Sequence, residues 1–147
     1  VGDDVIYGFS FSPDLYRLSL TRGTKETIPQ PAFNGHRNVS FTGSFDESEL
    51  LMHKSKSVVY GRLIYDEQSK KYCQTLFVPP DSSHPMYGIA QFIGVRYFDE
   101  SLNLLGEMTL PRGMAPEAYF IDGHLYVRYV EGVSENAIFL RKILTKT

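Results

Sequence analysis

The sequence contains no tryptophan, only one cysteine and no long hydrophobic run. The single thiol, Cys73, cannot form an internal disulfide, and it lacks partners at the spacing that a structural zinc site needs. We therefore expect Cys73 to be a small buried strand residue, because free cysteines are commonly buried. No segment approaches the ~20 consecutive apolar residues of a membrane-spanning helix, so no membrane span is predicted.

A signal peptide is not visible either. The chain opens Val1-Gly2-Asp3-Asp4, without an initiator methionine and without a charged region followed by an apolar one. A strand pattern begins almost at once, at residues 5–7. We therefore expect the chain to begin inside a larger protein.

The charge is nearly balanced, with 15 basic and 17 acidic residues and no basic stripe. Nucleic-acid binding is not expected, because it depends on clustered positive charge.

The composition is 42% hydrophobic and includes 10 Tyr and 10 Phe. These aromatic residues favour strands over helices and argue against disorder. The length of 147 residues suggests one domain with a sizeable core.

The clearest local pattern lies between Tyr119 and Leu144. Asp122-Gly123 separates two runs of aromatic and β-branched residues, and a type I′ turn favours this pair because both central residues need positive φ. A third apolar run follows after a polar turn. The pattern predicts three consecutive antiparallel strands, at residues 119–121, 124–130 and 137–144.

Further strands are predicted by the alternation of apolar and polar residues. They cover residues 5–11, 15–21, 26–28, 39–41, 57–65, 71–78, 91–98 and 104–110. Gly8, Gly61, Gly94 and Gly106 fall inside four of these strands, where glycine more often marks a bulge or close packing than a ligand. Residues 46–52 fit a helical turn or a short strand, with acidic residues at the start in either case.

Two of the predicted hairpins can be laid over each other. Tyr65-Asp66-Glu67 matches Phe98-Asp99-Glu100 at an offset of 33 residues (99 minus 66). Each hairpin then ends at a proline, Pro79 or Pro111. Repeated antiparallel hairpins are typical of a radially repeated β-sheet. An ordinary meander or a β-sandwich is the alternative, since its turns recur at similar spacing.

Three stretches carry a resemblance to a known family: residues 59–66, residues 98–107 and Gly123-His124-Leu125-Tyr126-Val127. They resemble bacterial envelope proteins of the six-bladed, TolB-like or NHL-like β-propeller type. In particular, residues ~50 to 147 are similar to the C-terminal half of an uncharacterised propeller family of predicted lipoproteins in Bacteroides-like bacteria. The resemblance implies a fold and a location in the bacterial cell envelope. It implies no activity, since that family has no assigned catalytic residues.

The predicted fold class is therefore all-β, an antiparallel β-propeller with four-stranded blades. A blade takes about 40 to 50 residues, so residues 1–147 supply about three blades. They form a single all-β domain or a fragment of a larger propeller. Half a ring would leave apolar faces and unpaired strand edges uncovered. We therefore expect the chain to belong to a longer protein or to complete itself as a homodimer.

Candidate chemical groups are scattered rather than clustered in the sequence. The four histidines, at positions 36, 53, 84 and 124, lack the spacing of metal ligands. Residues 81–84 contain the letters of a hydrolase triad, but sequence neighbours cannot orient one another as a triad requires. Asp66, Asp99 and Asp122 stand where Asx-turns favour aspartate. No catalytic residue, metal or cofactor is predicted.

The expected function is that of a non-enzymatic binding or scaffold module, because loops on a rigid scaffold commonly carry binding residues. The loops at 80–89 and 111–117 are expected to line one face of the ring, with His84, Tyr87 and Arg112 as ligand-binding residues. The expected partner is a protein or a glycan. The alternative is a propeller enzyme, a hydrolase or lyase acting on a glycan or lactone, which needs two carboxylates ~5 to 9 Å apart.

Overall fold

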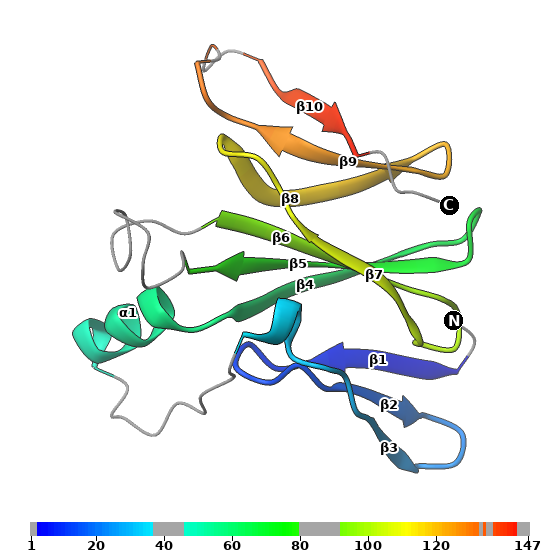
Figure 1. The fold of residues 1–147 in the computed structure, drawn as a ribbon. Helices are drawn as coiled ribbons and strands as arrows, with labels where there is room; N and C mark the ends of the chain where they lie inside the picture. The colour runs from blue at the N-terminus through cyan, green and yellow to red at the C-terminus, as the bar shows by residue number, and fades with distance from the viewer. Residues whose placement is uncertain (1–2, 37–45, 80–91, 133, 135–136, 144–147) are drawn as a thin grey trace.

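Three antiparallel β-sheets stacked one after another form the chain (Figure 1). The computed structural model describes residues 3–36, 46–79, 92–132, 134 and 137–143. The N-terminal sheet has the order β1-β2-β3, the central sheet β4-β5-β6-β7 and the C-terminal sheet β10-β9-β8. Within each sheet every described strand lies beside its neighbour in sequence. This order argues against the Greek-key sandwich, in which a strand returns beside an earlier one.

The strand bounds follow the predicted pattern closely. The N-terminal sheet contains β1 (Asp4–Gly8), β2 (Leu15–Ser19) and β3 (Lys25–Ile28). The central sheet contains β4 (Val59–Asp66), β5 (Lys71–Val78), β6 (Phe92–Phe98) and β7 (Leu104–Thr109). The C-terminal sheet contains β8 (Met114–Ile121), β9 (His124–Tyr129) and β10 (Phe139–Lys142). The all-β class is confirmed, and the strand predicted at 39–41 lies outside the described residues.

The expectation of four strands in every sheet is wrong for the described chain. Only the central sheet has four strands, and the other two have three each. The two hairpins related by the 33-residue offset are the two halves of this one central sheet, because β5 pairs with β6 over seven residue pairs from Tyr72↔Phe98 to Val78↔Phe92. The offset therefore relates hairpins within a sheet and does not relate one sheet to the next. The three sheets do not close into a ring.

The turn at Asp122-Gly123 has the predicted geometry. Both residues have positive φ, 49° at Asp122 and 71° at Gly123, as a type I′ turn requires. β8 and β9 consequently pair from Ile121↔His124 onward, and β10 adds to β9 on the other side. The three consecutive strands predicted here are confirmed.

The loop predicted at 111–117 is partly wrong, because β8 begins at Met114. Met114 is buried in the same core as Leu110, and this burial draws the chain into the sheet. Pro116 is tolerated because β8 is an edge strand and its register shifts between Met114 and Ala118.

In the described part of the chain, two helical segments lie between the N-terminal and central sheets. The helix α1 (Glu47–Lys56) begins at Asp46, whose carboxylate accepts hydrogen bonds from the backbone N–H groups of Ser48 (2.8 Å) and Glu49 (3.4 Å). The region predicted as a helical turn or a strand is thus a helix. A short 3-10 helix, η1 (Phe33–Gly35), follows β3. No helix in the described chain is long and apolar enough to cross a membrane.

The central sheet is covered on both faces. The face that carries Cys73 and Val95 packs against Ala118 and Val127 of the C-terminal sheet. The opposite face carries Tyr72 and packs against Leu15 of the N-terminal sheet. The prediction that Cys73 is buried is confirmed, and burial raises the pKa of its thiol to about 12.

Candidate functional site

A fully buried arginine, Arg96, takes part in a cluster of polar contacts that joins distant parts of the chain. It comes from β6, and the register places it directly opposite Glu107 on β7. The Arg96 Nε lies 3.3 Å from the Glu107 Oε2, and the Arg96 Nη2 donates a hydrogen bond to the Pro31 carbonyl. The side chain therefore connects the central sheet to the segment that follows β3.

Two aromatic rings enclose the Arg96 guanidinium. Its central carbon lies 5.5 Å from the Tyr60 ring centroid and 5.7 Å from the Phe98 ring centroid, distances at which a cation is attracted to an aromatic face. Desolvation lowers the pKa of Arg96, and the nearby Tyr60 and Glu107 oppose this shift. Arginine remains charged in such surroundings because its ordinary pKa is far above neutral.

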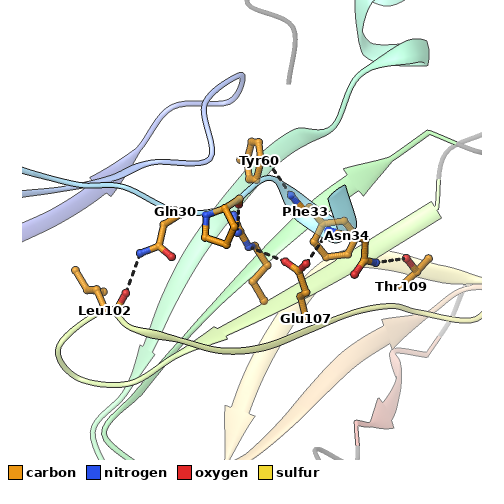
Figure 2. Close-up of polar contacts among 9 residues, drawn as sticks. Gln30, Phe33, Asn34, Tyr60, Leu102, Glu107 and Thr109 are labelled. Carbon is orange, nitrogen blue, oxygen red and sulfur yellow. Dashed lines mark hydrogen bonds and ion pairs between the residues drawn. The ribbon is translucent and has the colours of Figure 1, made fainter. Parts of the chain in front are cut away.

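The segment around η1 adds further contacts to the same cluster. The backbone N–H of Asn34 donates to the Glu107 Oε1 at 2.6 Å, and the backbone N–H of Phe33 donates to the Tyr60 hydroxyl at 3.4 Å. The Gln30 Nε2 donates to the Leu102 carbonyl at 2.8 Å (Figure 2). Arg96 and Glu107 thus hold a chain segment through the Arg96 Nη2 and the Glu107 Oε1, while the Arg96 Nη1 is buried without a hydrogen-bond partner among the described residues. This arrangement is that of a structural clamp.

Close packing brings η1 onto the central sheet beside this clamp. A Cβ atom at Gly94 would lie only 2.5 Å from the Leu76 Cδ1 and 2.7 Å from the Phe33 Cζ. A glycine is therefore required for Phe33 to reach its fully buried position. Gly106 has nothing within 4 Å of such a Cβ and instead lies next to the register shift between β6 and β7. Gly94 thus allows close packing and Gly106 lies beside a bulge, so both roles predicted for glycines in strands are present.

Of the three predicted ligand-binding residues, Arg112 lies in the described chain, whereas His84 and Tyr87 lie outside it. Arg112 is exposed in the turn between β7 and β8. Two backbone hydrogen bonds of 2.8 Å flank this turn, from Leu110 N–H to the Ile93 carbonyl and from Val130 N–H to the Gly113 carbonyl. They place Arg112 where β6 begins and β9 ends. Arg112 forms no ion pair with another described residue.

Three further residues lie near this turn and are not among the three predicted ligand-binding residues. The Arg141 guanidinium lies over the Tyr129 ring, 4.5 Å from its centroid. Glu131 approaches the turn so closely that a Cβ at Gly113 would lie 2.7 Å from its Oε2. Gly113 has φ of 85°. Pro111 and Gly113 on either side of Arg112 are sequence features that indicate a tight turn here. We call Arg112, Tyr129, Glu131 and Arg141 the turn cluster.

The carboxylates predicted at turns occupy them as expected. Asp66 accepts from the Ser69 N–H at 2.9 Å, and Asp99 accepts from the Asn103 N–H at 2.8 Å. Burial raises the pKa of Asp66, but its hydrogen bonds from Ser69 bring the pKa below the ordinary value. The side-chain hydrogen bond from Asn103 lowers the pKa of Asp99. No group of three or more His, Cys, Asp or Glu residues that could hold a metal occurs within the described ranges.

Comparison with known proteins supports the fold. No protein-family model matches the chain, and no curated protein matches it. The structure is similar to that of a member of the DUF4221 family from Bacteroides vulgatus, with a TM-score of 0.68 and 11% sequence identity. The match covers 96% of this chain and 43% of that protein, so the chain spans less than half of its length. This agrees with the expected resemblance to an uncharacterised Bacteroides family, and at this identity the likeness concerns the fold alone.

Proposed function

We propose that the chain is a non-enzymatic binding or scaffold module of the bacterial cell envelope, with its three sheets arranged as consecutive blades of a β-propeller. The sequential strand order within each sheet supports the blade arrangement. The stacking of one sheet on the next supports it as well (Figure 1). The envelope location rests on the sequence resemblance.

The observation that carries the binding role is the turn cluster at one end of the stacked sheets. The turn between β7 and β8 and the end of β9 lie together there (Figure 1). Arg112 presents an exposed guanidinium, and Arg141 is held over Tyr129. A charged group held by a rigid scaffold binds with little loss of conformational entropy.

The ligand class is inferred from the two arginines of the turn cluster, which outnumber its one carboxylate, Glu131. Arginine side chains recognise carboxylates through paired hydrogen bonds, and Tyr129 adds a flat amphipathic surface. We infer that the ligand is an acidic glycan or an acidic peptide segment of a protein. His84 and Tyr87, in the predicted loop at 80–89, are proposed as further contacts.

The test is binding of the purified chain to arrays of acidic glycans and acidic peptides, followed by titration of the best probe. Arg112→Ala should weaken binding about tenfold, which corresponds to about 1.4 kcal/mol, without lowering the melting temperature. Arg22→Ala is the matched control, because Arg22 is an exposed arginine in the turn between β2 and β3, at the opposite end of the molecule (Figure 1).

Two results would overturn the proposal. Equal binding by the Arg112→Ala variant and the wild type would remove the turn cluster from the ligand site. Turnover of a chromogenic glycoside or lactone, abolished by a single Asp or Glu substitution, would show that the chain is an enzyme.

A further inference from the structure

The short helix η1 contains the only Asn-Gly pair in the sequence, Asn34-Gly35. Both residues have positive φ, 46° at Asn34 and 72° at Gly35, a conformation that asparagine and glycine tolerate better than most residues. Both are exposed, although the preceding residue, Phe33, is fully buried. The pair therefore forms an exposed turn directly beside the structural clamp (Figure 2).

The Asn-Gly pair is open to attack by its own backbone. Gly35 has no side chain, and nothing lies within 4 Å of the position that a Cβ would occupy there. The Gly35 N–H donates to the Ala32 carbonyl at 3.3 Å, and the Asn34 Nδ2 donates to the Thr109 Oγ1 at 3.5 Å. Both hydrogen bonds are long and therefore weak. A transient opening of this turn is sufficient to bring the Gly35 nitrogen to the Asn34 Cγ.

We propose that Asn34 is a site of deamidation through a cyclic imide. The Gly35 nitrogen attacks the Asn34 Cγ and a C–N bond forms, while the Cγ–Nδ2 bond breaks and Nδ2 leaves as ammonia with the proton that the Gly35 nitrogen gives up. Water then opens the five-membered ring. Cleavage between the nitrogen and Cγ leaves aspartate at position 34, whereas cleavage between the nitrogen and the main-chain carbonyl carbon leaves isoaspartate. Neither step changes an oxidation state.

The modification acts on the structural clamp, because Asn34 is one of its members. The backbone N–H of Asn34 donates to the Glu107 Oε1 at 2.6 Å, so a carboxylate on the same residue places a second negative charge near Glu107. Isoaspartate lengthens the main chain inside the turn that the hydrogen bond from the His36 N–H to the Phe33 carbonyl closes at 2.8 Å. Either product weakens the contact of this segment with Glu107.

Asn103 is a matched control in the same chain. It is exposed like Asn34, but its side chain is held, because the Asn103 Nδ2 donates to the Asp99 Oδ2 at 2.9 Å. The following residue is Leu104, whose branched side chain shields the backbone nitrogen that would attack. Deamidation should therefore be much slower at Asn103. The inference goes beyond the proposed function and does not rest on ligand binding.

The first measurement compares the two asparagines in one sample of the wild type. The purified chain is incubated at mildly alkaline pH, which favours the deprotonated nitrogen, and is then digested for mass spectrometry. Conversion should be at least about tenfold faster at Asn34 than at Asn103, a difference of ~1.4 kcal/mol in activation free energy. Both aspartate and isoaspartate should appear at position 34. Asn34→Gln should stay unconverted there, because its longer side chain would have to close a larger ring.

The second measurement is urea unfolding of fresh and incubated samples. The incubated wild type should have a lower unfolding midpoint than the fresh wild type. The decrease should be smaller than that caused by Arg96→Ala, because the ion pair between Arg96 and Glu107 is still present. Incubated Asn34→Gln should keep the midpoint of the fresh variant, since position 34 is exposed and the substitution leaves the side chain neutral.

Three results would overturn the inference. Equal conversion at Asn34 and Asn103 would remove the assignment of the site. Conversion of Asn34 without a change in the unfolding midpoint would remove its effect on the structural clamp. An equal decrease in the midpoint of incubated Asn34→Gln would assign the lost stability to another residue. The first comparison uses the wild type alone, so it does not depend on the folding of any variant.

Discussion

The central sheet and the N-terminal sheet have similar strand pairs but different surroundings. Both carry a cross-strand tyrosine pair between their first two strands. On the central sheet this face is covered and holds a fully buried arginine, whereas on the N-terminal sheet the face is exposed. The difference teaches that the same cross-strand pair is part of the core where another sheet covers it and part of the surface where none of the described sheets does. Substitutions on the covered face should cost stability, and those on the exposed face should leave it nearly unchanged.

Arg96→Ala should have the largest effect on stability. It would leave Glu107 partly buried without its cation and would empty the space between the Tyr60 and Phe98 rings. Removing one partner of a buried ion pair costs about 3–5 kcal/mol, and we expect the lower end because Glu107 is 18% exposed. Urea unfolding followed by circular dichroism measures the loss. A loss below about 1 kcal/mol, the size of an ordinary surface change, would show that the clamp is not a main source of stability.

Gly94→Ala should have the second largest effect. The added methyl group would lie 2.5 Å from the Leu76 Cδ1 and 2.7 Å from the Phe33 Cζ, and such overpacking costs about 1–3 kcal/mol. Gly106→Ala is the matched control in the same sheet, because nothing lies within 4 Å of its added methyl group. Equal unfolding midpoints for the two variants would contradict the close packing of Phe33 on the central sheet.

Asp99→Ala should have a smaller effect that depends on pH. The hydrogen bonds from Asn103 lower the pKa of Asp99 in the folded chain, so the ionised form stabilises the fold. This contribution, roughly 0.5 kcal/mol for an exposed turn, is present above the ordinary aspartate pKa of about 3.9 and is lost as the pH falls through the lower folded value. The stability difference from the wild type should therefore shrink between pH 7 and pH ~3. A difference that grows on acidification would reverse the assigned shift.

Phe9→Glu should have the smallest effect on the stability of one chain. Phe9 is on the exposed face, and exposed substitutions usually change stability by less than about 0.5 kcal/mol. Urea unfolding followed by circular dichroism measures the difference from the wild type. A loss as large as that of Gly94→Ala would mean that Phe9 belongs to the core of the single chain.

Local features of the fold could be predicted from the sequence. The bounds of β5, residues 71–78, were predicted because alternation and the flanking turn and prolines define them. The turn at Asp122-Gly123 was predicted because few residue pairs adopt positive φ twice. The 33-residue offset located two turns correctly. The offset could not show that both hairpins belong to one sheet. Two adjacent hairpins have the same sequence pattern whether their edge strands pair in one sheet or the hairpins lie in two stacked sheets.

The structural clamp could not be predicted, because it depends on contacts between distant segments. Arg96 alternates with apolar residues in β6 and resembles a surface residue in the sequence. Its burial requires Pro31, 65 residues earlier, to fold back onto the central sheet. In the candidate site Arg112 was predicted from its loop, while Glu131 and Arg141 come from other strands and turns. Glu131 and Tyr129 lie beside Gly113, and Arg141 lies over Tyr129; these contacts follow from the pairing of β8 with β9 and of β9 with β10.

The most direct test of this account is urea unfolding of the Arg96→Ala variant beside the wild type and Gly106→Ala. If Arg96 holds the segment after β3 on the central sheet, Arg96→Ala will lower the free energy of unfolding by about 3 kcal/mol, whereas Gly106→Ala will leave it nearly unchanged. Equal unfolding midpoints for Arg96→Ala and Gly106→Ala would contradict the account.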